Sequence, residues 1–284
     1  MLIITSLGEL SAMRVAGNWK GRFAMRWVIL GTIGLVTLCG NFNYAGATVF
    51  DLQSDWSDTT NPNGVWSYNA GVNPLPHQDK LGLPYLVSNQ QPGWGPSDGS
   101  TLPPPPFLPI WFKAVQSNPT DQDGNPLDWH AGDIVTHSQD DYNGLGEGKS
   151  NVTFTYPGPD SAVANISGSV WMARDVGRVV GWALYLDNTL LTEGSVYSGD
   201  PYNRNSPLSL AAGSGGASAV TNLLLHANDV IKLEFTSEVD AAGEIVGEFV
   251  GANFDVTTVP EPSPFILVGT GAISLLACAW QRRK

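Results

Sequence analysis

The fold class follows from residues 179–197, whose sequence is VVGWALYLDNTLLTEGSVY. Apolar and β-branched residues fill two short runs, Val179–Leu186 and Thr189–Tyr197, as strands require. The two residues between the runs, Asp187 and Asn188, suit a two-residue hairpin turn. The stretch therefore predicts two antiparallel strands joined by a tight turn.

The same pattern recurs on both sides of this hairpin. In Val230–Phe235 the apolar side chains fall mainly on one face, as in a half-buried antiparallel strand. Other short runs are bounded by Gly, Pro, Asn and Asp, and no long helical period is present. These predicted strands are Thr48–Leu52, Gly64–Tyr68, Ile110–Val115, Ile134–His137, Val152–Tyr156, Val163–Met172, Ala219–Leu225 and Glu248–Val256. About ten strands of this kind predict an all-β, antiparallel sandwich of two sheets.

The N-terminal region has the order of a secretory signal peptide. The basic start MRW at residues 25–27 precedes an apolar run at 28–39, and Ala45 and Ala47 supply the small residues that signal peptidase needs. We therefore predict a signal helix that is cleaved after Ala47. A retained membrane anchor is the alternative. The start residue stays open among Met1, Met13 and Met25.

The C-terminal region has three parts. The first is the motif Val259, Pro260, Glu261 and Pro262, which is followed by the largely apolar run Phe265–Trp280 and by a final RRK at 282–284. The run is slightly shorter than the ~20 residues of an ordinary membrane-spanning helix, and the basic end fits the positive-inside rule. These features predict a C-terminal transmembrane helix.

This tripartite tail resembles the PEP-CTERM sorting signal of exported bacterial surface proteins. The resemblance implies a precursor anchored in the inner membrane, with its basic end in the cytoplasm. It also implies an exosortase-type transpeptidase that acts at the Pro-Glu-Pro motif, so that the mature protein lies at the cell surface or is extracellular. We therefore expect a signal region at 1–47, an extracellular β-sandwich at 48–258 and a sorting signal at 259–284.

Residues 142–256 also look like a jelly-roll domain of PEP-tailed surface proteins. The matching stretches are YNGLG at 142–146, ISGSVW at 166–171 and NDVI at 228–231. The resemblance implies a jelly-roll-like sandwich of the carbohydrate-binding kind. A fold of this kind does not by itself establish sugar binding.

The charged residues and the cysteines are unevenly distributed. Only Glu9 and Glu261 of the 26 acidic residues lie outside 48–258, whereas half of the 14 Lys and Arg residues do. The predicted sandwich is therefore strongly acidic, which excludes nucleic acid as a partner because phosphate binding needs clustered Lys and Arg. Cys39 and Cys278 lie in the two terminal apolar runs, so the sandwich contains no disulfide.

An acidic turn is a candidate calcium site. Asp121, Asp123, Asn125 and Asp128 place oxygen ligands around a glycine, as Ca²⁺ prefers. An EF-hand loop is excluded, because Gly132 stands where the loop needs its final glutamate. A calcium site of another geometry and a plain polar turn are the two alternatives.

No set of residues is predicted to be catalytic. His130, Asp133 and His137 offer three zinc ligands without a fourth. Ser214 lies in a flexible small-residue stretch rather than a strained elbow, and the many acidic residues single out no carboxylate pair. The sequence therefore predicts a protein that is not an enzyme and that requires no cofactor, with calcium as the one candidate.

Tryptophans are the candidates for sugar contact, because exposed indole faces stack on sugar rings. Trp171 and Trp182 lie inside patterned strands and are predicted to pack in the core. The predicted glycan contacts have polar, loop-rich neighbours and are Trp56, Trp66, Trp94 and Trp129. We expect a non-enzymatic cell-surface or extracellular-matrix protein associated with exopolysaccharide. A lectin-like carbohydrate-binding module and, less favoured, a secreted polysaccharide hydrolase are the alternatives.

Overall fold

The computed structural model of the chain describes residues 46–81, 91–98, 107–139 and 148–261. The predicted signal helix with Ala45, the motif residue Pro262 and the predicted transmembrane helix lie outside these residues. Within the described ranges, none of the helices has the length and apolar character needed to cross a bilayer.

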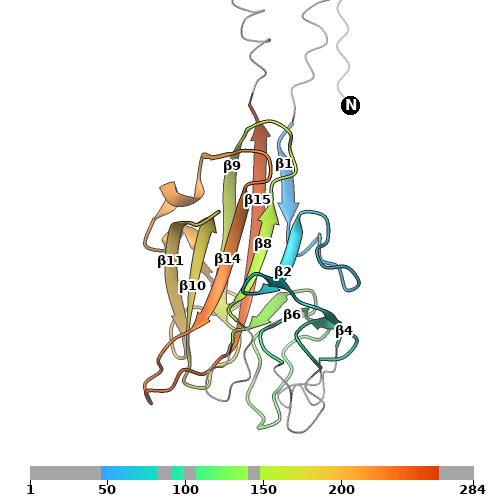
Figure 1. The fold of residues 1–284 in the computed structure, drawn as a ribbon. Coiled ribbons are helices and arrows are strands. Elements are labelled where there is room, and N and C mark those ends of the chain that lie inside the picture. Colours follow the sequence, from blue (N-terminus) through green and yellow to red (C-terminus); the bar gives the residue numbers. More distant parts are fainter. Residues whose placement is uncertain (1–45, 82–90, 99–106, 140–147, 262–284) are drawn as a thin grey trace, which may run out of the picture. The chain divides into compact units, whose positions relative to one another are not determined.

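The described strands form two antiparallel sheets (Figure 1). The nine-stranded sheet has the order β12-β9-β15-β7-β6-β5-β4, with β1 paired to β15 and β13 paired to β9. Its strands are β1 (Thr48–Asp51), β4 (His77–Gln78), β5 (Gly93–Trp94), β6 (Ile110–Lys113), β7 (Ile134–His137), β9 (Ala162–Met172), β12 (Leu208–Ser209), β13 (Leu223–Leu225) and β15 (Phe249–Pro260).

The six-stranded sheet has the order β11-β10-β14-β8-β2-β3. Its strands are β2 (Trp66–Ala70), β3 (Asn73–Pro74), β8 (Ser150–Thr155), β10 (Val179–Leu186), β11 (Thr189–Tyr197) and β14 (Val230–Ser237). The all-β, antiparallel sandwich predicted from the sequence is thus confirmed.

The hairpin of β10 and β11 forms as its sequence predicts. The two strands pair from Val179 opposite Tyr197 to Leu186 opposite Thr189. Asp187 adopts a φ of 52°, a left-handed conformation that aspartate tolerates. Its backbone N–H donates to the Val230 carbonyl at 2.7 Å, and its carboxylate accepts from the Val230 N–H at 2.9 Å. The turn is therefore also fastened to β14.

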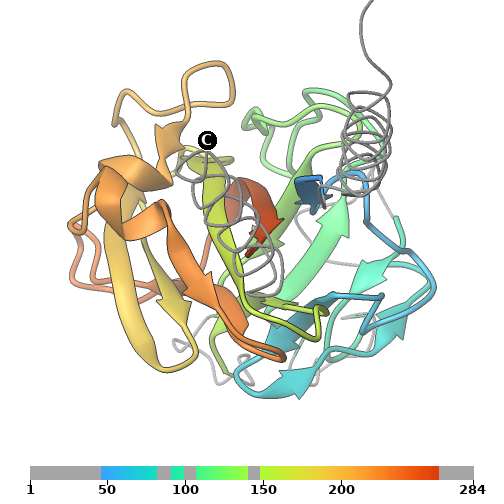
Figure 2. The ribbon, with the colours of Figure 1, turned by 90° about the horizontal axis from the view of Figure 1, so that it is seen from above.

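The main core lies between the two sheets. Trp182 and Leu184 of β10 and Phe235 of β14 are buried there with Val170 of β9 and Phe254 of β15. Since successive strand side chains alternate between faces, the odd-numbered residues of β10 point outward. Two short 3₁₀ turns, η2 (Leu210–Ala212) and η3 (Ala217–Val220), pack against β9 and β11 and cover one side of the sandwich, orange in Figure 2.

A second hydrophobic cluster lies on the other face of the nine-stranded sheet. Phe112, Trp171 and Phe249 project from their strands into this cluster, and the connection between β6 and β7 covers them with Leu127 and Trp129. The sheet is therefore buried on both faces in this region, which is why three consecutive residues of β6, Ile110–Phe112, are apolar without alternation.

Two predicted boundaries need correction. The domain does not end at residue 258, because β15 continues with Val259 opposite Val163 and Pro260 opposite Ala162. The Glu261 N–H then donates to the carbonyl of residue 161 at 3.3 Å. The predicted strand at 219–225 is a 3₁₀ turn in its first part and is a strand only over Leu223–Leu225.

Candidate functional site

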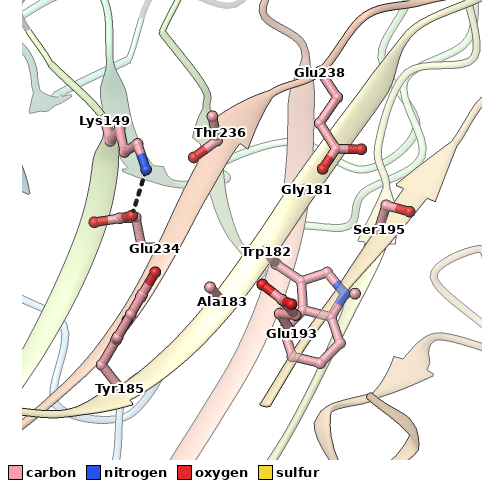
Figure 3. A pocket seen from close by; sticks show the side chains of 11 residues that line it. Lys149, Gly181, Trp182, Ala183, Tyr185, Glu193, Ser195, Glu234, Thr236 and Glu238 are labelled. Atoms are coloured by element: carbon pink, nitrogen blue, oxygen red, sulfur yellow. Dashed lines mark hydrogen bonds and ion pairs between the residues drawn. The ribbon is translucent and has the colours of Figure 1, made fainter. Parts of the chain in front are cut away.

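A groove of about 420 Å³ lies on the outer face of the six-stranded sheet (Figure 3). Its floor is made by Gly181 and Ala183, two small outward-facing residues of β10. Residues that are opposite each other on neighbouring strands share a face of the sheet. The sides of the groove therefore follow from the pairing of β10 with its two neighbours.

That pairing surrounds the small floor residues with longer polar ones. Gly181 is opposite Ser195 of β11 and Thr236 of β14, and Ala183 is opposite Glu193 and Glu234 of the same strands. Tyr185, two residues further along β10, stands at one end of the floor (Figure 3). On this face of the sheet, the middle strand β10 has only small side chains at residues 181 and 183, whereas β11 and β14 have longer ones. The difference in side-chain length creates the groove.

One side of the groove is closed by ion pairs. Lys149 Nζ lies 3.0 Å from Glu234 Oε1, and Lys232 Nζ lies 2.7 Å from Glu234 Oε2. Burial acts to raise the pKa of Glu234, but the two ammonium groups outweigh it and lower the pKa. Lys232 also stands 4.4 Å from the centre of the Tyr185 ring, which fixes that ring by a cation–π contact.

Two further carboxylates line the groove, Glu193 on β11 and Glu238 directly after the end of β14. The Glu238 carboxylate lies directly over Gly181, because a Cβ at residue 181 would overlap its Oε1 atom. Burial raises the pKa of Glu238, and the charge of Glu193 raises it further. Lys149 is the one cation among the described residues that line the groove, and it is engaged by Glu234.

Hydrogen-bond donors and acceptors lie along the open groove. The hydroxyls of Tyr185, Ser195 and Thr236 can donate or accept, whereas the carboxylates of Glu193 and Glu238 accept. A polyhydroxylated ligand presents both kinds of group and can pair with all of them. The groove therefore has the hydrogen-bonding groups that glycan binding requires.

A second hollow of about 280 Å³ contains paired charges. Arg174, which is 11% exposed, bonds the buried carboxylate of Asp121 at 2.6 Å and lies 3.4 Å from Glu248. Burial raises the pKa of Glu248 to about 7 although Arg174 opposes the shift, and burial lowers the pKa of His137 to about 4. Arg178 lies 2.6 Å from Asp240. Each guanidinium is therefore already neutralised by carboxylates of the chain.

The predicted calcium turn contributes to this ion-pair network. Burial acts to raise the pKa of Asp121, but hydrogen bonds from Asn125 and Arg174 outweigh it and lower the pKa to about 2. Asp128 accepts from the Arg204 N–H at 2.8 Å, and Asp123 lies on the exposed part of the turn. In the described residues, no three His, Cys, Asp or Glu side chains are arranged to hold a metal ion. The calcium interpretation therefore needs correction, because a guanidinium occupies the place beside Asp121.

Three of the four predicted glycan contacts are core residues. Trp66, Trp94 and Trp129 are at most 2% exposed, so no indole face is open to a sugar ring. Trp129 packs edge-on against Phe112 at 5.5 Å between ring centres. Trp56 is half-buried and packs 4.4 Å from the Tyr68 ring. The prediction of a glycan contact is therefore wrong for these three residues. Each has polar neighbours in the sequence, but its own side chain is buried.

The groove residues were missed from sequence, although a signal for them exists. Gly181, Ala183 and Tyr185 occupy every second position of a strand that the sequence predicts, so they share its outward face. What the sequence lacks is the register that places Glu193 and Glu234 beside Ala183.

Comparisons with known proteins give no family. No protein-family model matches the chain, and no curated protein is significantly similar to it. The solved structure of the Podospora anserina GH26-CBM35 β-(1,4)-mannanase has a TM-score of 0.25 and 18% sequence identity, and the match covers 55% of this chain and 29% of that chain. The chain thus spans less than a third of that structure, and a TM-score of this size assigns no function.

Proposed function

We propose that the protein is a non-enzymatic, exported cell-surface or matrix protein that associates with extracellular polysaccharide through the groove on β10, β11 and β14. The observation that carries the proposal is the glycine–alanine floor between two rows of hydrogen-bonding side chains. Because these side chains stand on paired strands rather than on loops, they are held in position before a ligand arrives. Such preorganisation lowers the entropic cost of binding.

Export and sorting are part of the same proposal. β1 begins at Thr48, directly after the proposed signal-peptidase site, and Thr48 pairs with Thr258 of β15. The two proposed processing sites therefore flank one end of the sandwich. In the proposed route the tail holds the precursor in the inner membrane, and an exosortase-type transpeptidase acts at the Pro-Glu-Pro motif, which begins at the last residue of β15, Pro260.

The binding proposal is tested with the full-length chain, purified in a mild detergent. Affinity electrophoresis through gels that contain mannan, chitosan or alginate, each with calcium and with chelator, measures retardation by each polysaccharide. We expect retardation by at least one polymer, and Ala183→Leu to abolish it by filling the floor. Tyr185→Ala removes the end of the groove and is matched by Tyr197→Ala, an exposed tyrosine on β11 outside the groove lining.

Three results would contradict this function. Migration of the wild type that is unchanged in every polymer removes the binding role. Retardation that Ala183→Leu leaves intact places binding elsewhere. Release of reducing ends from any polymer shows turnover and assigns the protein as a secreted polysaccharide hydrolase, which is the less favoured alternative.

A further inference from the structure

We propose that the groove selects glycans that carry amino groups over acidic glycans, with Glu193 and Glu238 as the residues that determine this preference. The inference rests on the proposed function of the groove and names the class of glycan that it takes. It follows from the uneven distribution of ion pairs within the groove.

The part of the groove beside Glu234 has little capacity to bind an ionic ligand. Glu234 is bonded to Lys149 at 3.0 Å and to Lys232 at 2.7 Å, so both ammonium groups already have a carboxylate partner. An acidic sugar would have to displace Glu234 from these lysines to gain an ion pair. The exchange adds no ion pair, because each new pair replaces an existing one. It also leaves the carboxylate of Glu234, which is 8% exposed, without its cations.

The rest of the groove has acceptors without a cation. Glu193 and Glu238 both line the groove, and the charge of Glu193 contributes to the raised pKa of Glu238. Two carboxylates that repel each other gain when a cation enters between them. An ammonium group on a sugar ring would supply that cation over Gly181, where the Glu238 carboxylate lies.

The size and lining of the groove favour a sugar rather than a simple cation. The groove has a volume of about 420 Å³, and Tyr185, Ser195 and Thr236 line it together with the two carboxylates. The hydroxyls of these residues can donate to or accept from the hydroxyls of a sugar ring. Trp182 takes no part in this contact, because it is opposite Gly194 and packs on the core face of the sheet.

The test compares two hexasaccharides that differ in the amino group, which is free and cationic in one and acetylated and neutral in the other. Isothermal titration measures binding of full-length protein to a glucosamine hexamer and to its N-acetylated counterpart at about pH 6 and low salt, where ordinary glutamates are ionised. A polygalacturonate oligomer serves as the acidic probe. We expect the wild type to prefer the amino form by up to about fivefold for each exposed carboxylate, and to bind polygalacturonate most weakly.

The double variant Glu193→Gln/Glu238→Gln should lose this preference while it retains affinity for the acetylated hexamer. Asp160→Asn removes one exposed charge in the β8–β9 connection and should keep the preference. Equal binding of both hexamers by the wild type, or a preference that survives in the double variant, overturns the inference and leaves the proposed function intact. Binding of none of the three probes overturns the inference as well, and the polysaccharide gels then decide separately whether the groove binds glycan.

Discussion

Among the charged residues of the sandwich, Arg174 is the one whose substitution we expect to lower the free energy of unfolding most. Its guanidinium lies 2.6 Å from Asp121 and 3.4 Å from Glu248, and these two carboxylate side chains are 0% and 1% exposed. Arg174→Met keeps much of the side-chain volume but leaves two buried acids without their cation. Removing one partner from a buried ion pair costs about 3–5 kcal/mol. We expect the free energy of unfolding of Arg174→Met to fall by that amount.

The assay is urea unfolding of the full-length chain at neutral pH, followed by tryptophan fluorescence. The midpoint should fall while the denaturant slope stays the same, as for a change in stability alone. Lys80→Met is the control, because Lys80 is exposed and a surface substitution changes stability by about 0.5 kcal/mol or less. A loss in Arg174→Met that is no larger than in this control would show that the buried carboxylates do not depend on the guanidinium.

Three further predictions concern buried residues. The pKa of Glu248 is raised from 4.5 to about 7, so its contribution to stability is complete below pH 4.5 and is lost as the pH rises to about 7. The unfolding free energy of Glu248→Gln relative to the wild type should therefore increase between these pH values in urea titrations, and a constant difference would contradict the assignment. Trp129→Ala truncates a core side chain and should lower the unfolding free energy by about 3–5 kcal/mol. The folded variant should still be retarded by polysaccharide, and weaker retardation would show that Trp129 is a glycan contact. Gly251→Ala places a Cβ against the buried Trp171 ring and should lower the thermal midpoint by the equivalent of about 1–3 kcal/mol; an unchanged midpoint would show that the ring can move.

Local sequence patterns predicted the strands because alternation and turn chemistry are properties of neighbouring residues. The hairpin at 179–197 carries both signals, and its two strands form with the predicted bounds. The short pairings of β3, β4, β5 and β12 were missed, since two residues are too few to show a period. Their pairing depends on longer strands beside them.

The site residues were harder to predict, because their roles depend on contacts between distant segments. Asp121 meets Arg174, a residue 53 positions away, and this contact turns an apparent calcium ligand into half of an ion pair. Trp129 is buried because Trp171 and Phe249 pack in the same cluster. The residues next to Asp121 and Trp129 in the sequence do not indicate either contact.

In the proposed function, a glycan occupies the outer face of β10, β11 and β14. Hydrogen–deuterium exchange of the full-length chain, with and without the polysaccharide that retards it most, locates the bound surface directly. We expect slower exchange in peptides that contain residues 179–197 and 230–238, and no change of exchange in the Ala183→Leu variant. Protection confined to other segments, such as the turn at 121–128, would show that the glycan binds elsewhere.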